Sequence, residues 1–143
     1  MSDIKASNQQ KKAYLRRYLA AERLERELTD ELTTTLMYYA YPKAITYDHA
    51  GGGSGGPRDL SDFAVKVDRL QTRLLAERSR MIELRLEITD RINAVPDETE
   101  RLLLRLRYIR GESFERIAGE LGYTWRHTMR IHGNALQHFE TAE

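Results

Sequence analysis

The chain has 143 residues, of which 41% are hydrophobic and 31% charged, and its formal net charge is +1. This composition is typical of a folded protein and excludes wholesale disorder. The chain contains no cysteine, which excludes disulfides and thiolate metal sites and allows a reducing compartment.

The beginning of the chain gives no sign of export. Residues 1–12 lack the apolar core of a signal peptide. No apolar run approaches the ~20 residues that a membrane-spanning helix needs. We therefore expect a cytoplasmic protein that has no membrane contact.

The segment from Lys11 to Tyr39 is predicted to form one long amphipathic helix, because it contains neither glycine nor proline. Its leucines recur at spacings of four or five and form a stripe that needs a partner surface. They are Leu15, Leu19, Leu24, Leu28, Leu32 and Leu36. The beginning of this helix is basic. A phosphate-contacting arm is one interpretation, and a solvated helix face is the preferred one.

Pro42 is expected to end this helix, since proline lacks an amide donor and restricts the preceding residue. A tyrosine cluster surrounds it, which either anchors a protein partner or covers the end of a helical pair. The cluster consists of Tyr38, Tyr39, Tyr41 and Tyr47. The following GGGSGGP, from Gly51, has the composition of a flexible linker. It lacks the lysine and hydroxyl residue of a P-loop, so no nucleotide site is expected.

A second long helix is predicted from the N-cap Ser61 to about Ala94. Its apolar residues alternate at spacings of three and four, as in a coiled coil. They are Leu60, Phe63, Val67, Leu70, Leu74, Met81, Leu84, Ile88 and Val95. Glu77 and Arg91 take inward positions in this heptad pattern. The helix forms either a dimeric coiled coil, in which these polar residues set the register, or an antiparallel hairpin with the first helix.

Four further apolar residues widen the apolar face of this second helix beyond a two-stranded seam. They are Leu75, Ile82, Leu86 and Ile92. The wider face favours the hairpin within one chain, and it leaves additional self-association open.

A compact three-helix domain is predicted after Pro96. Asp97 and the acidic residues behind it suit a helix start, because they complement the positive end of the helix dipole. The buried face of this helix is formed by Leu102, Leu103, Leu106 and Ile109. The helix ends before Gly111, and Ser113 is predicted to cap the next one.

Residues 111–136 have the spacing of a helix-turn-helix. Ala118 is small where the second helix must cross closely, and Gly122 fits the left-handed position that ends the first helix. Tyr123 is predicted to plug the corner. Thr124 is predicted to cap the second helix by accepting from the amide of His127. The alternative is an ordinary antiparallel helix pair with a glycine in its turn.

The inward face of the second helix is predicted to carry Thr128, Ile131 and Ala135. Thr128 is unusual there, because an aliphatic residue is the common choice at such a position.

The sequence LRLRYIRGESFERIAGELGYTWRHTMRIHGNAL, from Leu104 to Leu136, resembles region 4 of sigma-70-type factors. The likeness lies in the LRYI-G-S entry, the IA--LG turn and the IH--AL end of the recognition helix. The whole layout is similar to small phage and prophage transcription regulators of the ArpU and RinA type. The resemblance implies a recognition helix, residues 124–136, that docks in the major groove. Trp125 and Thr128 depart from the usual sigma pattern, so the resemblance does not imply a −35-like target sequence.

The surface of this domain is basic. Between Arg105 and Asn134 there are six arginines and three acids, a local excess of +3 that suits a phosphate backbone. By helical spacing and by the resemblance, the predicted base contacts are Trp125, Arg126, Met129 and Arg130. Arginine at such positions donates two hydrogen bonds to guanine. Contacts with the DNA backbone position the protein on the duplex but do not specify a base sequence. The predicted backbone contacts are Arg107, Arg110, Arg116, Thr124, His127 and Asn134.

No enzyme, metal site or cofactor is expected. The four histidines show no HExxH pattern, and the spacing of five between His127 and His132 places them on different helix faces. No Gly-x-Ser-x-Gly elbow occurs.

The sequence predicts an all-α protein, in which a long helical hairpin or coiled coil precedes a helix-turn-helix domain. The predicted segments are residues 1–50, a long helix with a tyrosine-rich end; residues 51–58, a linker; residues 59–95, the heptad helix; and residues 96–143, the helix-turn-helix domain. The expected function is sequence-specific binding of double-stranded DNA in transcription regulation of phage type. The helical half then contacts a second copy or RNA polymerase. The alternatives are a small terminase subunit and a sigma-like protein-interaction module that does not bind DNA.

Overall fold

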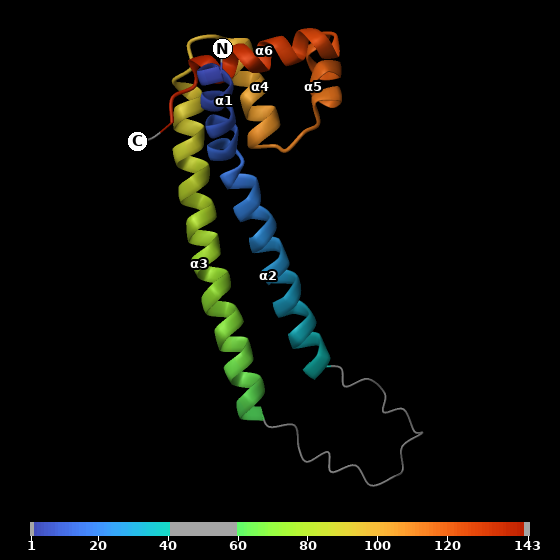
Figure 1. Cartoon of the computed structure of the whole chain (residues 1–143). Coiled ribbons are helices and arrows are strands. Elements are labelled where there is room, and N and C mark those ends of the chain that lie inside the picture. Colours follow the sequence, from blue (N-terminus) through green and yellow to red (C-terminus); the bar gives the residue numbers. More distant parts are fainter. Residues whose placement is uncertain (1, 41–59, 142–143) are drawn as a thin grey trace. The chain divides into compact units, whose positions relative to one another are not determined.

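The structure, a computed structural model, describes residues 2–40 and 60–141. These residues form six α-helices and no strands, which confirms the predicted all-α class (Figure 1). The helices are α1 (Ser2–Leu15), α2 (Arg17–Ala40), α3 (Leu60–Asn93), α4 (Glu98–Tyr108), α5 (Phe114–Leu121) and α6 (Trp125–His138). The predictions for Tyr41, Pro42, Tyr47 and the glycine-rich segment 51–58 lie outside the described residues.

The residues group into two compact units. One unit consists of Met1–Glu22 together with Arg80–Glu143, and the other of Arg23–Ser79. The predicted segments follow the chain in order, whereas the first unit combines its two ends. The beginning of the chain therefore packs with the C-terminal helices.

The N-terminal helix differs from its prediction. Helix begins at Ser2, well before Lys11, and a turn at Arg16 divides it into α1 and α2. The backbone stays hydrogen bonded through this turn, since the Arg16 amide donates to the Lys12 carbonyl at 2.9 Å. The leucine stripe begins only at Leu15, so apolar periodicity gave no signal for the largely exposed residues before it.

In the second unit α2 and α3 form the predicted antiparallel hairpin. Leu28 and Leu74 are buried between the two helices at 3% and 5% exposure. Arg78 Nε pairs with Glu25 Oε1 at 2.8 Å. The rings of Tyr39 of α2 and Phe63 of α3 stack with their centroids 3.6 Å apart. The hairpin within one chain is therefore confirmed.

The beginning of α3 corrects two details of the heptad prediction. Leu60 is 75% exposed and is the first helical residue, so it contributes nothing to the buried stripe. Ser61 therefore lies within the helix and does not cap it. At the inward position of Glu77, one carboxylate oxygen is buried without a hydrogen-bond partner.

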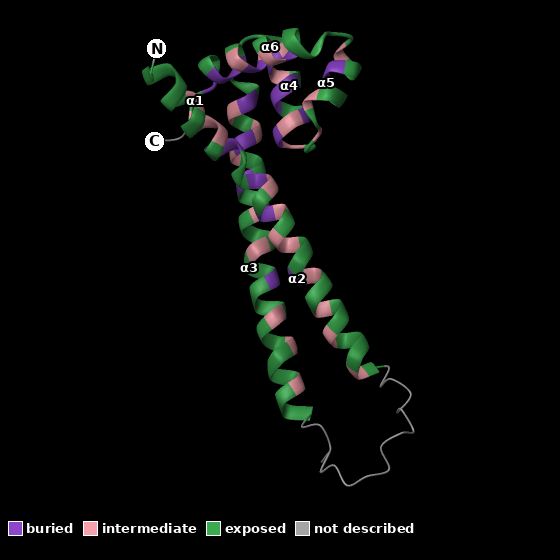
Figure 2. Ribbon diagram, turned by 45° about the vertical axis from the view of Figure 1, so that its right-hand side comes forward, coloured by how far each residue is buried: buried purple, intermediate pink, exposed green. Residues whose placement is uncertain are grey.

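The first unit has a core built from α1, the beginning of α2, the C-terminal part of α3, α4 and α6 (Figure 2). Its most deeply buried members are Leu15, Ile88, Ile92, Val95, Leu104, Ala135, Leu136 and Phe139. Tyr14 of α1 donates to Glu87 Oε1 of α3 at 2.7 Å, and its ring lies 5.9 Å from that of Phe139. Both ends of the chain thus contribute to one core.

A smaller core lies under the helix-turn-helix. It contains Leu103, Leu106 and Ile117, with Phe114, Leu121 and Ile131 packed against them. The prediction for Leu102 was wrong, because its side chain is 39% exposed, whereas Leu104 is fully buried. The reason is that α4 contributes to both cores. Leu104 faces the larger core and Leu103 the smaller one, and this leaves Leu102 outside.

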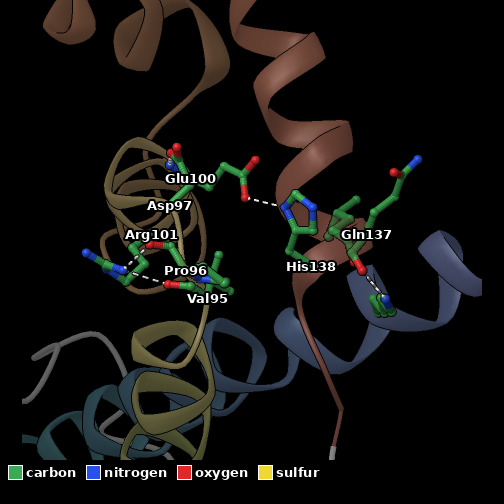
Figure 3. Close-up of polar contacts among 9 residues, drawn as sticks. Val95, Pro96, Asp97, Glu100, Arg101, Gln137 and His138 are labelled. Carbon is green, nitrogen blue, oxygen red and sulfur yellow. Dashed lines mark hydrogen bonds and ion pairs between the residues drawn. The ribbon is translucent and has the colours of Figure 1, made fainter.

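Polar contacts fix the ends of α4 and α6 (Figure 3). Asp97 caps α4 by accepting from the Glu100 amide at 2.9 Å. His138 Nδ1 lies 2.7 Å from Glu100 Oε2, which joins the two helices. Lys11 Nζ of α1 donates to the carbonyls of Leu136 and Gln137 at 2.8 and 3.3 Å. A lysine at a helix C-terminus satisfies free carbonyls and complements the helix dipole.

Candidate nucleic-acid interface

The helix-turn-helix is assembled from local caps. Ser113 accepts from the Arg116 amide at the start of α5, and Thr124 accepts from the His127 amide at 3.1 Å at the start of α6. Gly122 ends α5 in the left-handed conformation, with φ 71° and ψ 28°. These three predictions are confirmed. Helices α4 and α5 both lie on the same side of α6 (Figure 1).

Two glycines of the turn region give opposite predictions. Gly122→Ala is expected to destabilise the protein by about 1–2 kcal/mol, because the left-handed conformation strains any residue with a Cβ. Gly119→Ala is expected to stabilise it by about 1 kcal/mol, because alanine is the better helix former. At both positions an added Cβ meets no atom within 4 Å, so neither effect includes a clash. Denaturant unfolding measures both. Equal effects of the two changes would contradict this assignment of strain.

Tyr123 does not plug the corner. Its side chain is 41% exposed, and its ring meets the His127 ring edge-on with centroids 4.7 Å apart. Leu103, Leu106 and Ile117 already fill the space beneath the turn, and this leaves the tyrosine on the surface. Tyr123, Trp125 and His127 are thus three exposed aromatic residues near the beginning of α6.

The inward face of α6 consists of Thr128, His132, Ala135 and Leu136, all buried. The unusual threonine is explained, since Thr128 is fully buried and its Oγ1 donates to the Thr124 carbonyl at 2.9 Å. Its hydroxyl is therefore satisfied within the helix, and only its methyl group needs an apolar neighbour. Ile131 is half-buried against the smaller core, as predicted.

The outward face of α6 carries the predicted base contacts. Trp125 is 54% exposed, Arg126 and Arg130 are exposed, and Met129 is half-buried. Neither arginine forms a hydrogen bond or ion pair with any other described residue. Helix α6 also contains no acidic residue. Two unpaired guanidinium groups one helical turn apart therefore face solvent on a helix fixed at both ends.

The residues predicted to contact the DNA backbone differ in whether their side chains already bind other residues of the protein. Arg107 Nη1 donates to the Glu112 carbonyl at 2.9 Å, and its guanidinium lies 4.3 Å above the Phe114 ring. Arg110 pairs with Glu112 at 3.5 Å and Arg116 with Glu120 at 4.0 Å, although both side chains are mostly exposed. Thr124, His127 and Asn134 are exposed. Arg107 thus also supports the fold, and all six contacts with DNA stay predictions.

Sequence reasoning missed the role of His132. It is 3% exposed, and its Nε2 is hydrogen bonded to Tyr108 Oη at 2.7 Å. Burial, together with the positive charges of Lys12, Arg107 and Arg16, lowers its pKa to about 4. His132 is therefore neutral at pH 7 and ties α6 to α4. Its burial could have been predicted from its helical spacing, because it lies on the same helix face as Thr128 and Ala135.

The described residues contain no group of three histidine, aspartate or glutamate side chains placed to hold a metal ion. None of the helices that they form combines the length and the apolarity needed to cross a bilayer.

Comparison with known proteins gives no relative for this chain: no family model, no curated protein and no solved structure matches it.

Proposed function

We propose that this protein binds double-stranded DNA in a sequence-specific manner and regulates transcription, as the regulators that its sequence resembles imply. Helix α6 is the recognition helix in the major groove. The observation that carries the proposal is the outward face of α6, where Arg126 and Arg130 are exposed and unpaired among the described residues. Arginine in this setting binds guanine O6 and N7 with two hydrogen bonds.

The architecture behind this face supports the proposal. The Thr124 cap and the hydrogen bonds from Lys11 hold both ends of α6, and the Tyr108–His132 pair holds its inward side. A recognition helix must be held rigidly, because base contacts depend on precise placement of the side chains. Arg110 and Arg116 lie at the α4–α5 loop and on α5, where their exposed guanidinium groups are suited to phosphates.

The test is binding of the purified protein to sheared DNA of its source genome at about 150 mM salt, where non-specific binding is weak, followed by sequencing of the bound fragments. The expected result is enrichment of a promoter-like locus. An Arg126→Ala/Arg130→Ala variant should lose it, because one bidentate arginine contributes about 1–3 kcal/mol of base discrimination.

The matched control is Arg73→Ala/Arg80→Ala, which removes the same charge from exposed arginines of α3. It should retain the enrichment. Equal loss in both variants would mean that only net charge matters, and sequence reading by α6 would then be wrong. Enrichment within packaging genes would favour a terminase subunit. No enrichment for the wild-type protein would favour a protein-interaction module.

A further inference from the structure

Helix α3 has two apolar stripes on different faces. Its inward stripe includes Leu74, Leu84, Ile88 and Ile92, all buried. A second set of apolar side chains on the same helix is exposed: Val65 at 55%, Leu75 at 65%, Ile82 at 54% and Leu86 at 61%. Four large aliphatic side chains more than half exposed on one helix are costly in water, since each leaves apolar surface uncovered.

The exposed side chains follow the spacing of a coiled-coil seam. Along this face the residues are spaced alternately three and four positions apart. They are Val65, Asp68, Thr72, Leu75, Ser79, Ile82 and Leu86. In heptad terms Leu75 and Ile82 take d positions, and Val65 and Leu86 take a positions. The average spacing of 3.5 residues keeps such a stripe in contact with another helix along its length.

Charged residues flank this seam asymmetrically. Arg78 and Arg85 take g positions on one side, and Glu83 and Asp90 take e positions on the other. In a parallel pair of helices a g residue faces the e residue five positions later on the partner. Arg78 then meets Glu83 of a second copy, and Arg85 meets Asp90 of a second copy. An antiparallel pair would place like charges opposite one another.

The present partners of these residues leave room for such pairs. Glu83 and Asp90 are exposed and make no hydrogen bond or ion pair with a described residue. Arg78 uses its Nε for Glu25, and its side chain remains 46% exposed. Arg85 is exposed, and its Nη1 lies 3.5 Å from the hydroxyl of Tyr18, whose ring lies beneath the guanidinium.

We propose that the protein associates with a second copy of itself through this outward stripe of α3, with the two α3 helices parallel and in register. Parallel pairing brings the C-terminal ends of both α3 helices, and the α4 segments that follow them, to the same end of the pair. Asp68, Thr72 and Ser79 make parts of the seam polar, so the association is weak and depends on concentration. The proposal does not depend on DNA binding.

Sedimentation equilibrium of the full chain over a range of concentrations tests the proposal. The wild-type protein is expected to form dimers, and an Ile82→Glu/Leu86→Glu variant to stay monomeric. Both positions are exposed, so the variant should keep its helical circular dichroism. Arg73→Glu is the control, because it changes the net charge equally at an exposed position off the seam. A monomeric wild-type protein, or dimers in the double variant, would overturn the proposal.

Charge reversal tests the pairing. A Glu83→Lys/Asp90→Lys variant should dimerise about tenfold more weakly or worse, because attractive pairs become repulsive. Adding Arg78→Glu/Arg85→Glu in the same chain should restore dimerisation. Unchanged association in the first variant, or no restoration in the second, would exclude the parallel g-to-e pairing.

Cysteine cross-linking tests the direction, because the natural chain has no cysteine. Thr72→Cys and Ser79→Cys, made separately, both place a thiol at an a position. In a parallel pair in register each thiol meets its own counterpart, so both variants should form disulfide-linked dimers on mild oxidation. In an antiparallel pair at most one of them can do so. Cross-linking of only one variant, or of neither, would contradict the parallel register.

Discussion

Replacing Phe139 with alanine is expected to lower the free energy of unfolding by about 3–5 kcal/mol, the usual cost of truncating a buried phenylalanine. Phe139 is fully buried although it follows the last helix of the chain. Its ring lies 5.9 Å from that of Tyr14, so the substitution leaves a cavity between α1 and the end of α6. Denaturant unfolding followed by circular dichroism measures the loss.

Tyr123→Ala is the control for this prediction. It removes an aromatic ring that is 41% exposed from the same unit, and its cost should be about 1 kcal/mol or less. A loss as small for Phe139→Ala as for the control would show that α1 does not close this core in solution.

Acidification from pH 6.5 to pH 4 is expected to remove about 3 kcal/mol of stability through His132. Burial, with Lys12, Arg107 and Arg16 nearby, lowers the folded-state pKa of His132 to about 4, against an ordinary value of 6.5. The unfolded chain therefore binds the proton first as the pH falls. The contribution of neutral His132 is complete above pH 6.5 and is lost toward pH 4, at about 1.4 kcal/mol for each unit of pKa difference.

Stability curves of the wild-type protein and a His132→Gln variant between pH 4 and pH 7 test this prediction. The variant should be less stable at pH 7, because glutamine keeps a hydrogen-bonding group for Tyr108 but loses the imidazole ring that packs against Tyr108 and Phe114. The difference between the two proteins should shrink as the pH falls, since only the wild-type protein has His132 to protonate. Parallel curves would contradict a neutral, buried His132.

The candidate site was predictable where its determinants are local in the chain. A cap depends on a side chain and an amide three residues away, as in Thr124 and His127, and the left-handed end of α5 needs only a glycine at position 122. Helical spacing likewise predicted that Thr128 faces inward and that Arg126 and Arg130 face outward. Because these features arise within a few residues, composition and periodicity were enough to find them.

The parts that were missed depend on packing between distant segments. Whether Leu102 or Leu104 is buried depends on the two cores that α4 joins, and the exposure of Tyr123 depends on residues that already fill the space beneath it. Lys11 holds the end of α6 from 125 residues away along the chain. None of these three facts follows from the neighbouring sequence.

The helical class, the caps and turn of the helix-turn-helix and the outward face of α6 were thus predictable from the sequence, because they follow from short-range hydrogen bonds and helical periodicity. The packing of distant segments was needed to show that α1 completes the core of the C-terminal helices and that His132 is buried and neutral. It also separated the apolar residues of α3 into a buried stripe and an exposed one. Burial depends on how the whole chain packs. The sequence of a helix with two apolar faces does not specify which face the other helices of the chain cover.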